Sequence, residues 1–128
     1  MSPARLEHVN LTVKDPKATA AWMHRVFGWH TRWEGPGMQT GYTVHVGEED
    51  TYVALFSYGE DAETAPYDRY RTNGALNHIA VVVDDIDVAE EAVKAEGFTP
   101  INHASYEPGK RFYVLDENEV EIEIVAYD

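Results

Sequence analysis

The sequence predicts an α+β fold built from two copies of one βαβββ unit within 128 residues. A strand-like segment at 6–13 recurs at 76–83, and each copy continues with a helical pattern and three more strand-like runs. Apolar residues form 44% of the chain, which is enough for a buried core and argues against a disordered protein. We expect one domain over 1–128, with module 1 at about 5–58, a connector at 59–74 and module 2 at about 75–126.

The first strand of each copy carries a histidine at the same place. The segments LEHVNLTV and LNHIAVVV share a leucine, a histidine at the third position and apolar residues at every second position after it. Side chains alternate between the two faces of a strand, so the apolar residues face one way and His8 and His78 face the other.

A helix is expected after each first strand. Asp15 is a suitable N-cap with Pro16 at the first helical position, and Gly28 ends the pattern. Asp85 caps the second helix and Gly97 closes it. The two glycines are 69 positions apart and the two histidines 70, so the copies stay in register to within one residue.

Three strand-like runs separated by turn signals then follow, at 30–34, 39–46 and 51–58 in the first copy and at 99–105, 110–115 and 119–126 in the second. In the last run, apolar residues alternate with Glu119, Glu121 and Glu123, which share the opposite face. Alternation alone does not choose among the three glutamates.

The charge balance and the absence of cysteine narrow the function. Acidic residues number 23 against 10 basic ones, a net charge of -13, which argues against binding nucleic acid or an anionic membrane. Without cysteine there is no disulfide, thiolate nucleophile or cysteine-based zinc site. No run approaches the roughly 18 apolar residues of a membrane span. We expect a cytoplasmic protein with a site made of imidazole and oxygen groups.

Two duplicated histidines suggest a shared role. If the units pair through their first strands, His8 and His78 come together on one concave surface, where a glutamate of the last strand could join them. Two imidazoles and one carboxylate suit a divalent metal, including non-haem iron. The competing interpretation is a pair of hydrogen-bonded structural histidines beside a solvated row of glutamates.

The quoted segments resemble the vicinal oxygen chelate superfamily, which includes glyoxalase I, bleomycin-resistance proteins and extradiol dioxygenases. LEHV and LNHIAV are similar to its two strand openings, and RFYVLD followed by EIEIV is similar to its final hairpin. The resemblance covers nearly the whole chain and implies paired modules that form a cupped, open mixed sheet with the helices outside. It also implies a bound divalent metal ion, such as Fe, Mn, Zn or Ni.

By this resemblance, His8, His78 and Glu123 align with metal-ligand positions. The counterpart of position 123 in the first copy is Ala54, where four-ligand members carry a second Glu or Gln. This departure puts a glyoxalase I or epimerase function in doubt and leaves a three-ligand pattern. Tyr52, Ala54, Phe56 and Arg111 are expected to line the substrate pocket, and His45, His103 and Tyr113 are candidate proton donors or acceptors.

The favoured hypothesis is an extradiol-dioxygenase-like metal enzyme whose substrate carries two adjacent oxygens, with an aromatic compound a candidate. Two alternatives stay open: a metal-free, bleomycin-resistance-like binding protein, and a lyase or isomerase with an atypical ligand set. A fosfomycin-type reaction is less favoured, because ten lysines and arginines without a cluster make a poor phosphonate pocket. The resemblance also implies a homodimer, and the connector is long enough for the cleft to use one chain or two.

Overall fold

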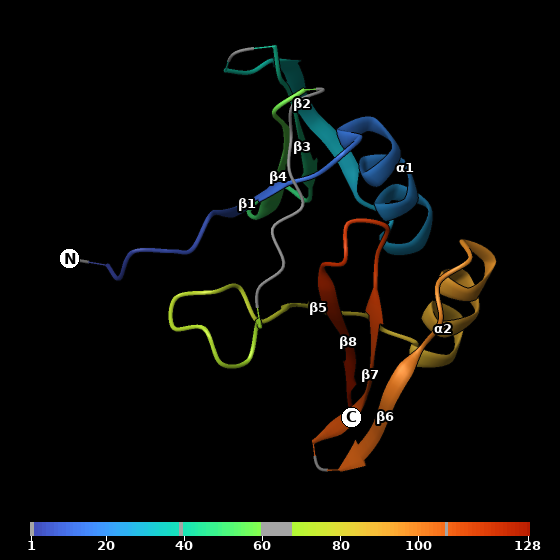
Figure 1. Cartoon of the computed structure of the whole chain (residues 1–128). Helices are drawn as coiled ribbons and strands as arrows, with labels where there is room; N and C mark the ends of the chain where they lie inside the picture. The colour runs from blue at the N-terminus through green and yellow to red at the C-terminus, as the bar shows by residue number, and fades with distance from the viewer. Residues whose placement is uncertain (1, 39, 60–67, 107) are drawn as a thin grey trace. The chain divides into compact units, whose positions relative to one another are not determined.

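Each half of the chain forms a four-stranded mixed sheet and one helix (Figure 1). The structure is a computed structural model that describes residues 2–38, 40–59, 68–106 and 108–128. It divides into two units, Met1–Glu63 and Thr64–Asp128. The predicted α+β class and the duplicated βαβββ order are confirmed.

The first unit contains β1 (His8–Thr12), α1 (Pro16–Phe27), β2 (His30–Pro36), β3 (Tyr42–Gly47) and β4 (Tyr52–Ser57). Its sheet has the order β1-β4-β3-β2, in which β1 runs parallel to β4 and the other pairs are antiparallel. The second unit repeats this plan with β5 (Ile79–Val82), α2 (Ile86–Ala95), β6 (Ile101–Tyr106), β7 (Gly109–Leu115) and β8 (Glu121–Tyr127). Its order is β5-β8-β7-β6, again with one parallel pair.

The helix boundaries follow the capping signals. The Asp15 side chain accepts a hydrogen bond from the Ala18 amide, and Gly28 ends α1 in the left-handed conformation with φ 73°. Asp85 caps α2 in the same way. The second helix ends at Ala95, two residues before Gly97, whose φ is 92°.

Each helix covers one face of its own sheet with apolar side chains. In the first unit, α1 packs on β3 and β4 and buries Trp22 and Met23. In the second, α2 contacts β8 and buries Ala89 and Val93, and Phe112 is also fully buried. Because side chains alternate along a strand, the polar residues of β1, and Glu121 and Glu123 of β8, lie on the face turned away from the helix.

Most strand boundaries differ from the expectation by one to three residues, and two of the differences concern residues singled out above. The run expected from position 39 begins as β3 at Tyr42, and Gln39 itself lies outside the described residues. The last strand begins at Glu121 instead of Glu119, because Glu119 has φ 62° and belongs to the preceding turn. Of the expected connector, 60–67 lie outside the described residues.

No helix in the described ranges is long and apolar enough to cross a membrane.

An ion pair on the helix side of the second unit predicts a pH effect. His103 Nε2 lies 2.7 Å from Glu90 Oε1, and this bond, with Lys94, holds the pKa of Glu90 below its ordinary value of 4.5. A carboxyl with a lowered folded pKa stabilises the protein above the unfolded value, and the gain is lost as pH falls through the folded value. Glu90→Gln should therefore flatten the loss of unfolding free energy on acidification below about pH 4.5, measured by urea denaturation. Glu49→Gln, in an exposed turn, should keep the wild-type slope.

Candidate metal and ligand site

The histidine of β1 is oriented by the residue before it. His8 Nδ1 lies 2.9 Å from Glu7 Oε1, and the Tyr52 hydroxyl donates to the same oxygen at 3.2 Å. These two hydrogen bonds hold the pKa of Glu7 below its ordinary value. Since Nδ1 donates its proton to the carboxylate, the lone pair of the imidazole lies on Nε2, the tautomer that a metal-binding histidine uses.

The histidine immediately before β5, His78, is oriented in the same way. His78 Nδ1 lies 2.7 Å from Asn77 Oδ1, so this nitrogen donates to the amide oxygen and the lone pair lies on Nε2. Glu7 and Asn77 precede their histidines at equivalent positions of the two copies. The duplication therefore includes both the imidazole and the group that sets its tautomer.

The Nε2 atom of His78 faces a buried carboxylate. It lies 3.1 Å from Glu123 Oε1, and only 7% of Glu123 is exposed. Arg111 Nη1 donates to Glu123 Oε2 at 2.9 Å, and the Tyr113 hydroxyl donates to Oε1 at 3.2 Å. Burial and the negative charge of Glu123 raise the pKa of Tyr113, so its phenol stays protonated.

A second carboxylate is buried beside the first. Glu121 is 6% exposed, accepts a hydrogen bond from the Tyr70 hydroxyl, and has Oε2 3.8 Å from His78 Nδ1. Together with His78, Arg111, Tyr113 and Glu123 it forms a group that we call the His78 cluster. Within this cluster, Arg111 is the one arginine that faces the negative charges of two buried carboxylates, Glu121 and Glu123.

Within the His78 cluster, the imidazole of His78 and the carboxylate of Glu123 face each other. With Nδ1 donating to Asn77, the lone pair of His78 Nε2 and an oxygen lone pair of Glu123 face each other at 3.1 Å. Two acceptors at this distance need a proton or a metal ion between them. The atoms that surround this position, an imidazole nitrogen and a carboxylate oxygen, are common ligands of divalent metals.

The backbone register of the two copies corresponds at the positions of Glu123 and Ala54. In the second unit, Glu123 pairs with Ala80 of β5 and Tyr113 of β7. In the first, Ala54 pairs with Asn10 of β1 and His45 of β3. Ala54 thus stands where Glu123 stands in the other copy, and it is 1% exposed. The first unit has no carboxylate at this register position.

Aromatic side chains surround His8 on the open face of the first sheet. The Tyr52 ring stacks at 4.8 Å on His8 and at 4.7 Å on His45, and Trp33 lies 5.2 Å from His45. We call these four residues, with Glu7, the His8 cluster. His45 forms no hydrogen bond with any residue the structure describes, and burial, together with the charges of His8 and Arg32, lowers its pKa. A neutral imidazole with a nitrogen available can accept a proton from a ligand.

Phe56 and His103, two of the predicted site residues, belong to neither the His8 cluster nor the His78 cluster. Phe56 is half-buried on β4, two residues after Ala54 on the same face, and pairs with Thr43. His103 does not join the His78 cluster: it bonds to Glu90 of α2, and its ring stacks on the buried Phe112 at 5.9 Å. The register of β6 shifts between Ile101 and Ala104, and Asn102 has φ 55°, so simple alternation does not apply there.

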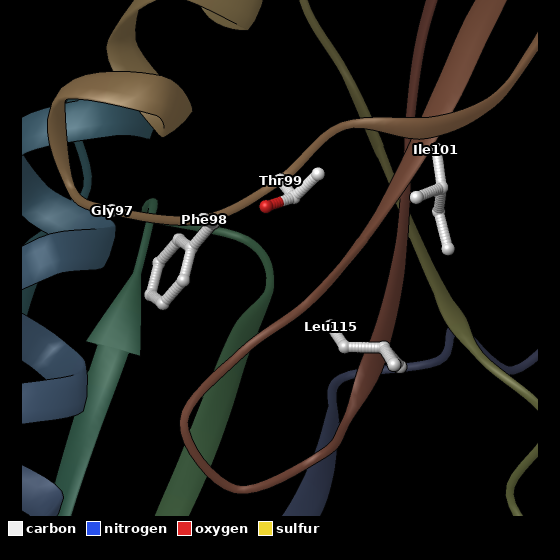
Figure 2. Close-up of a pocket in the computed structure, with 5 residues that line it drawn as sticks. All are labelled: Gly97, Phe98, Thr99, Ile101 and Leu115. Carbon is white, nitrogen blue, oxygen red and sulfur yellow. The ribbon is translucent and has the colours of Figure 1, made fainter.

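A separate pocket lies at the end of α2 (Figure 2). It has a volume of about 300 Å³ and is lined by Gly97, Phe98, Thr99, Ile101 and Leu115. Figure 2 shows that Thr99 supplies the one side-chain oxygen among the five labelled residues. None of the five carries an ionisable side chain, so this pocket offers no group for acid–base chemistry or metal binding.

Sequence reasoning missed several residues of the two clusters. Glu7 and Asn77 could have been found, because each precedes a duplicated histidine and carries an oxygen acceptor. Tyr70 and Arg32 gave no comparable signal, since their contacts depend on a turn and on an irregular strand. In the part of the chain the structure describes, no three His, Asp or Glu side chains form a complete metal-binding group.

The chain matches the family model described as the Glyoxalase/Bleomycin resistance protein/Dioxygenase superfamily over residues 5–124. Among solved structures, a glyoxylase/bleomycin resistance protein/dioxygenase domain from Frankia sp. EAN1pec has a TM-score of 0.81 at 21% identity, covering 99% of this chain and 94% of that one. The fosfomycin resistance protein FosX from Listeria monocytogenes, complexed with Mn(II) and sulfate, has a TM-score of 0.71 at 18% identity, covering 99% and 95%. An integron cassette protein from the mobile metagenome of V. cholerae has a TM-score of 0.67 at 19% identity, covering 100% and 98%. No curated protein matches the chain in sequence.

Proposed function

Because the chain belongs to the Glyoxalase/Bleomycin resistance protein/Dioxygenase superfamily, we propose that it is a metal-dependent enzyme of the vicinal oxygen chelate type with an extradiol-dioxygenase-like reaction. The ligands are His8, His78 and Glu123. The observation that carries the proposal is the matched orientation of the two histidines, each with Nδ1 bonded to the preceding side chain and Nε2 left as the lone-pair nitrogen.

Two imidazoles and one carboxylate form the ligand set typical of non-haem Fe(II) enzymes, and Mn(II) accepts the same set. A divalent ion held there would supply a Lewis acid for a substrate with two adjacent oxygens. FosX, which has the same fold, was solved with Mn(II), and this supports a metal role for the fold without indicating the reaction. Ala54 removes the fourth ligand, which disfavours a glyoxalase I-type lyase or an isomerase.

The surrounding residues would perform distinct tasks. Arg111 holds Glu123 Oε2, which leaves Oε1 directed at His78 Nε2. Tyr113 is a neutral phenol within hydrogen-bond distance of Glu123, where it can donate to an incoming oxygen. His45 is a neutral imidazole beside His8 and can accept the proton of a substrate hydroxyl.

The proposal is tested with protein purified without a histidine tag. We expect about one Fe or Mn per chain by elemental analysis, and oxygen consumption when catechols are added to the Fe(II)-loaded protein under air. Metal content at background after incubation with Fe(II), Mn(II), Zn(II) and Ni(II) would contradict metal dependence. Stoichiometric metal without oxygen uptake on a catechol panel would contradict the dioxygenase reaction alone.

A metal-free binding protein is the second candidate, and one observation favours it. Arg111 Nη1 and Glu123 Oε2 form a charge-assisted bond of 2.9 Å, so the arginine supplies the carboxylate with a counter-charge from within the chain. The exposed Trp33 ring, with the half-buried rings of Tyr52 and His45 beside it, would then be the binding surface for a flat ligand. Metal-independent binding of aromatic ligands, with no turnover, is the expected result for this candidate.

The residues that orient the histidines yield a prediction of their own. Asn77→Ala leaves His78 in place but frees its Nδ1, so the ring loses its fixed tautomer and orientation. We expect Mn(II) binding to weaken by about 10- to 100-fold, as for other groups behind metal-binding histidines, measured by isothermal titration calorimetry. Asn73→Ala, at an exposed turn position, is the matched control and should bind Mn(II) like the wild type. Equal affinities of the two variants would show that Asn77 does not act on the metal site.

A further inference from the structure

We propose that Arg32 is an anion-binding residue of the ligand site and that the substrate carries a carboxylate beside its aromatic ring. This inference rests on the proposed function, which gives the substrate two adjacent oxygens. It adds a carboxylate to that substrate. It is carried by the position of Arg32 on the sheet, by its lack of a carboxylate partner and by the aromatic rings around it.

A β-bulge brings Arg32 to the open face of the first sheet. Thr31 pairs with Val46, and Trp33 pairs with the very next residue of β3, His45, so Arg32 is an extra residue in β2. In a regular strand Arg32 and Trp33 would face opposite ways. Here both reach the same side, with Trp33 against His45 and the Arg32 guanidinium 4.4 Å from the centre of the Tyr52 ring. Bulges often re-aim a side chain next to a functional site.

The charge of Arg32 is available to a ligand. The protein has 23 acidic residues and only 10 basic ones, so positive charge that a ligand could use is scarce in it. Within the described ranges, Arg32 forms no ion pair, and its guanidinium contacts the Tyr52 ring in a cation–π interaction. Glu7 is the carboxylate that acts on it at longer range, and Glu7 is already bonded to His8 and Tyr52. Arg111, in contrast, is neutralised by Glu123.

The rings beside Arg32 define the rest of the ligand. Trp33 is 51% exposed, and its ring lies over Gly35, where an added Cβ would approach it to 2.8 Å. The exposed indole, beside the half-buried rings of His45 and Tyr52, thus offers ring surface next to the exposed guanidinium of Arg32. A flat ring can stack on such a surface, and a carboxylate matches the paired donors of a guanidinium. A carboxylated aromatic diol combines these features with the two oxygens of the proposed reaction.

The test compares 3,4-dihydroxybenzoate with its neutral amide, 3,4-dihydroxybenzamide, on the full chain. Binding is measured by calorimetry and by tryptophan fluorescence under nitrogen, with metal-free and with Mn(II)-loaded protein. We expect the wild type to bind the acid about 10-fold or more tighter than the amide. In Arg32→Gln this preference should fall to near unity, and Arg32→Lys should retain part of it as a point charge. Arg71→Gln, whose side chain is 89% exposed in a turn, should keep the wild-type preference.

The ratio of the two affinities distinguishes a loss of the anion contact from a loss of folded protein. A general loss of stability would weaken the binding of the acid and of the amide alike. Wild type that binds the acid no better than the amide, or neither compound, overturns the proposal, as does an unchanged ratio in Arg32→Gln. A preference for the acid, with affinities for both compounds that Mn(II) does not strengthen, supports the role of Arg32 while contradicting the metal-dependent function. The two ideas therefore fail on different observations.

Discussion

Replacing His78 by Ala is expected to weaken Mn(II) or Fe(II) binding by more than about 100-fold. Removing only the hydrogen-bond partner of a metal-binding residue already lowers metal affinity by up to about 100-fold, and this change removes the binding residue itself. The change removes the Nε2 lone pair that faces Glu123 Oε1 at 3.1 Å. It leaves only His8 and Glu123 of the proposed ligands, and Glu123 is already bonded to Arg111 and Tyr113. Calorimetry and elemental analysis after dialysis measure the effect.

The control for this loss is another histidine of the same chain. His30 begins β2 and is exposed, so His30→Ala should keep the metal content of the wild type. The His78 side chain is 32% exposed, so its truncation should leave the fold intact, which circular dichroism and urea denaturation would verify. Stoichiometric metal in folded His78→Ala would remove His78 from the ligand set and with it the proposed three-ligand site.

Replacing Arg111 by Met is expected to lower the unfolding free energy of the metal-free protein by about 3 kcal/mol, in the range for breaking a buried ion pair. The side chains of Arg111 and Glu123 are 13% and 10% exposed, so water can do little to replace the lost charge. Methionine keeps an unbranched stem but leaves the Glu123 carboxylate buried without its cation, beside the buried Glu121. Urea denaturation gives the difference directly.

Two further variants test whether the stability lost in Arg111→Met comes from its buried ion pair with Glu123. The double variant Arg111→Met with Glu123→Gln removes both charges, so it should recover much of the stability lost in Arg111→Met. Lys94→Met breaks ion pairs in which the lysine is 49% exposed, and it should cost less than about 1 kcal/mol. A loss in Arg111→Met no larger than in Lys94→Met would show that the buried pair does not stabilise the protein.

Several features of the fold could be predicted because they depend on neighbours in sequence. The capping residues Asp15 and Asp85 and the left-handed Gly28 fix helix ends through local hydrogen bonds and φ values. Alternation in β1 and β5 depends only on the two-residue period of a strand, so the shared face of His8 and His78 within their own sheets followed from the repeat. The same repeat identified Ala54 as the counterpart of Glu123, and the strand register agrees.

Other features could not be predicted because they depend on irregular backbone or on contacts between distant segments. Alternation treated Glu119, Glu121 and Glu123 alike, whereas a turn removes Glu119 from the strand and His78 Nε2 lies nearest Glu123. His103 was expected among candidate acid–base groups, but irregular pairing in β6 directs it to Glu90 on the helix side.

The sequence by itself determined the duplicated βαβββ plan, the two equivalent histidines and the absence of a carboxylate at position 54, since each is a matter of spacing and residue type. Only the tertiary structure decided that Nδ1 of each histidine is occupied, that Arg111 neutralises Glu123 and that a bulge turns Arg32 toward Tyr52. The reason is physical: side-chain alternation is set within one strand, whereas hydrogen bonds, ion pairs and bulges depend on the strand that lies beside it.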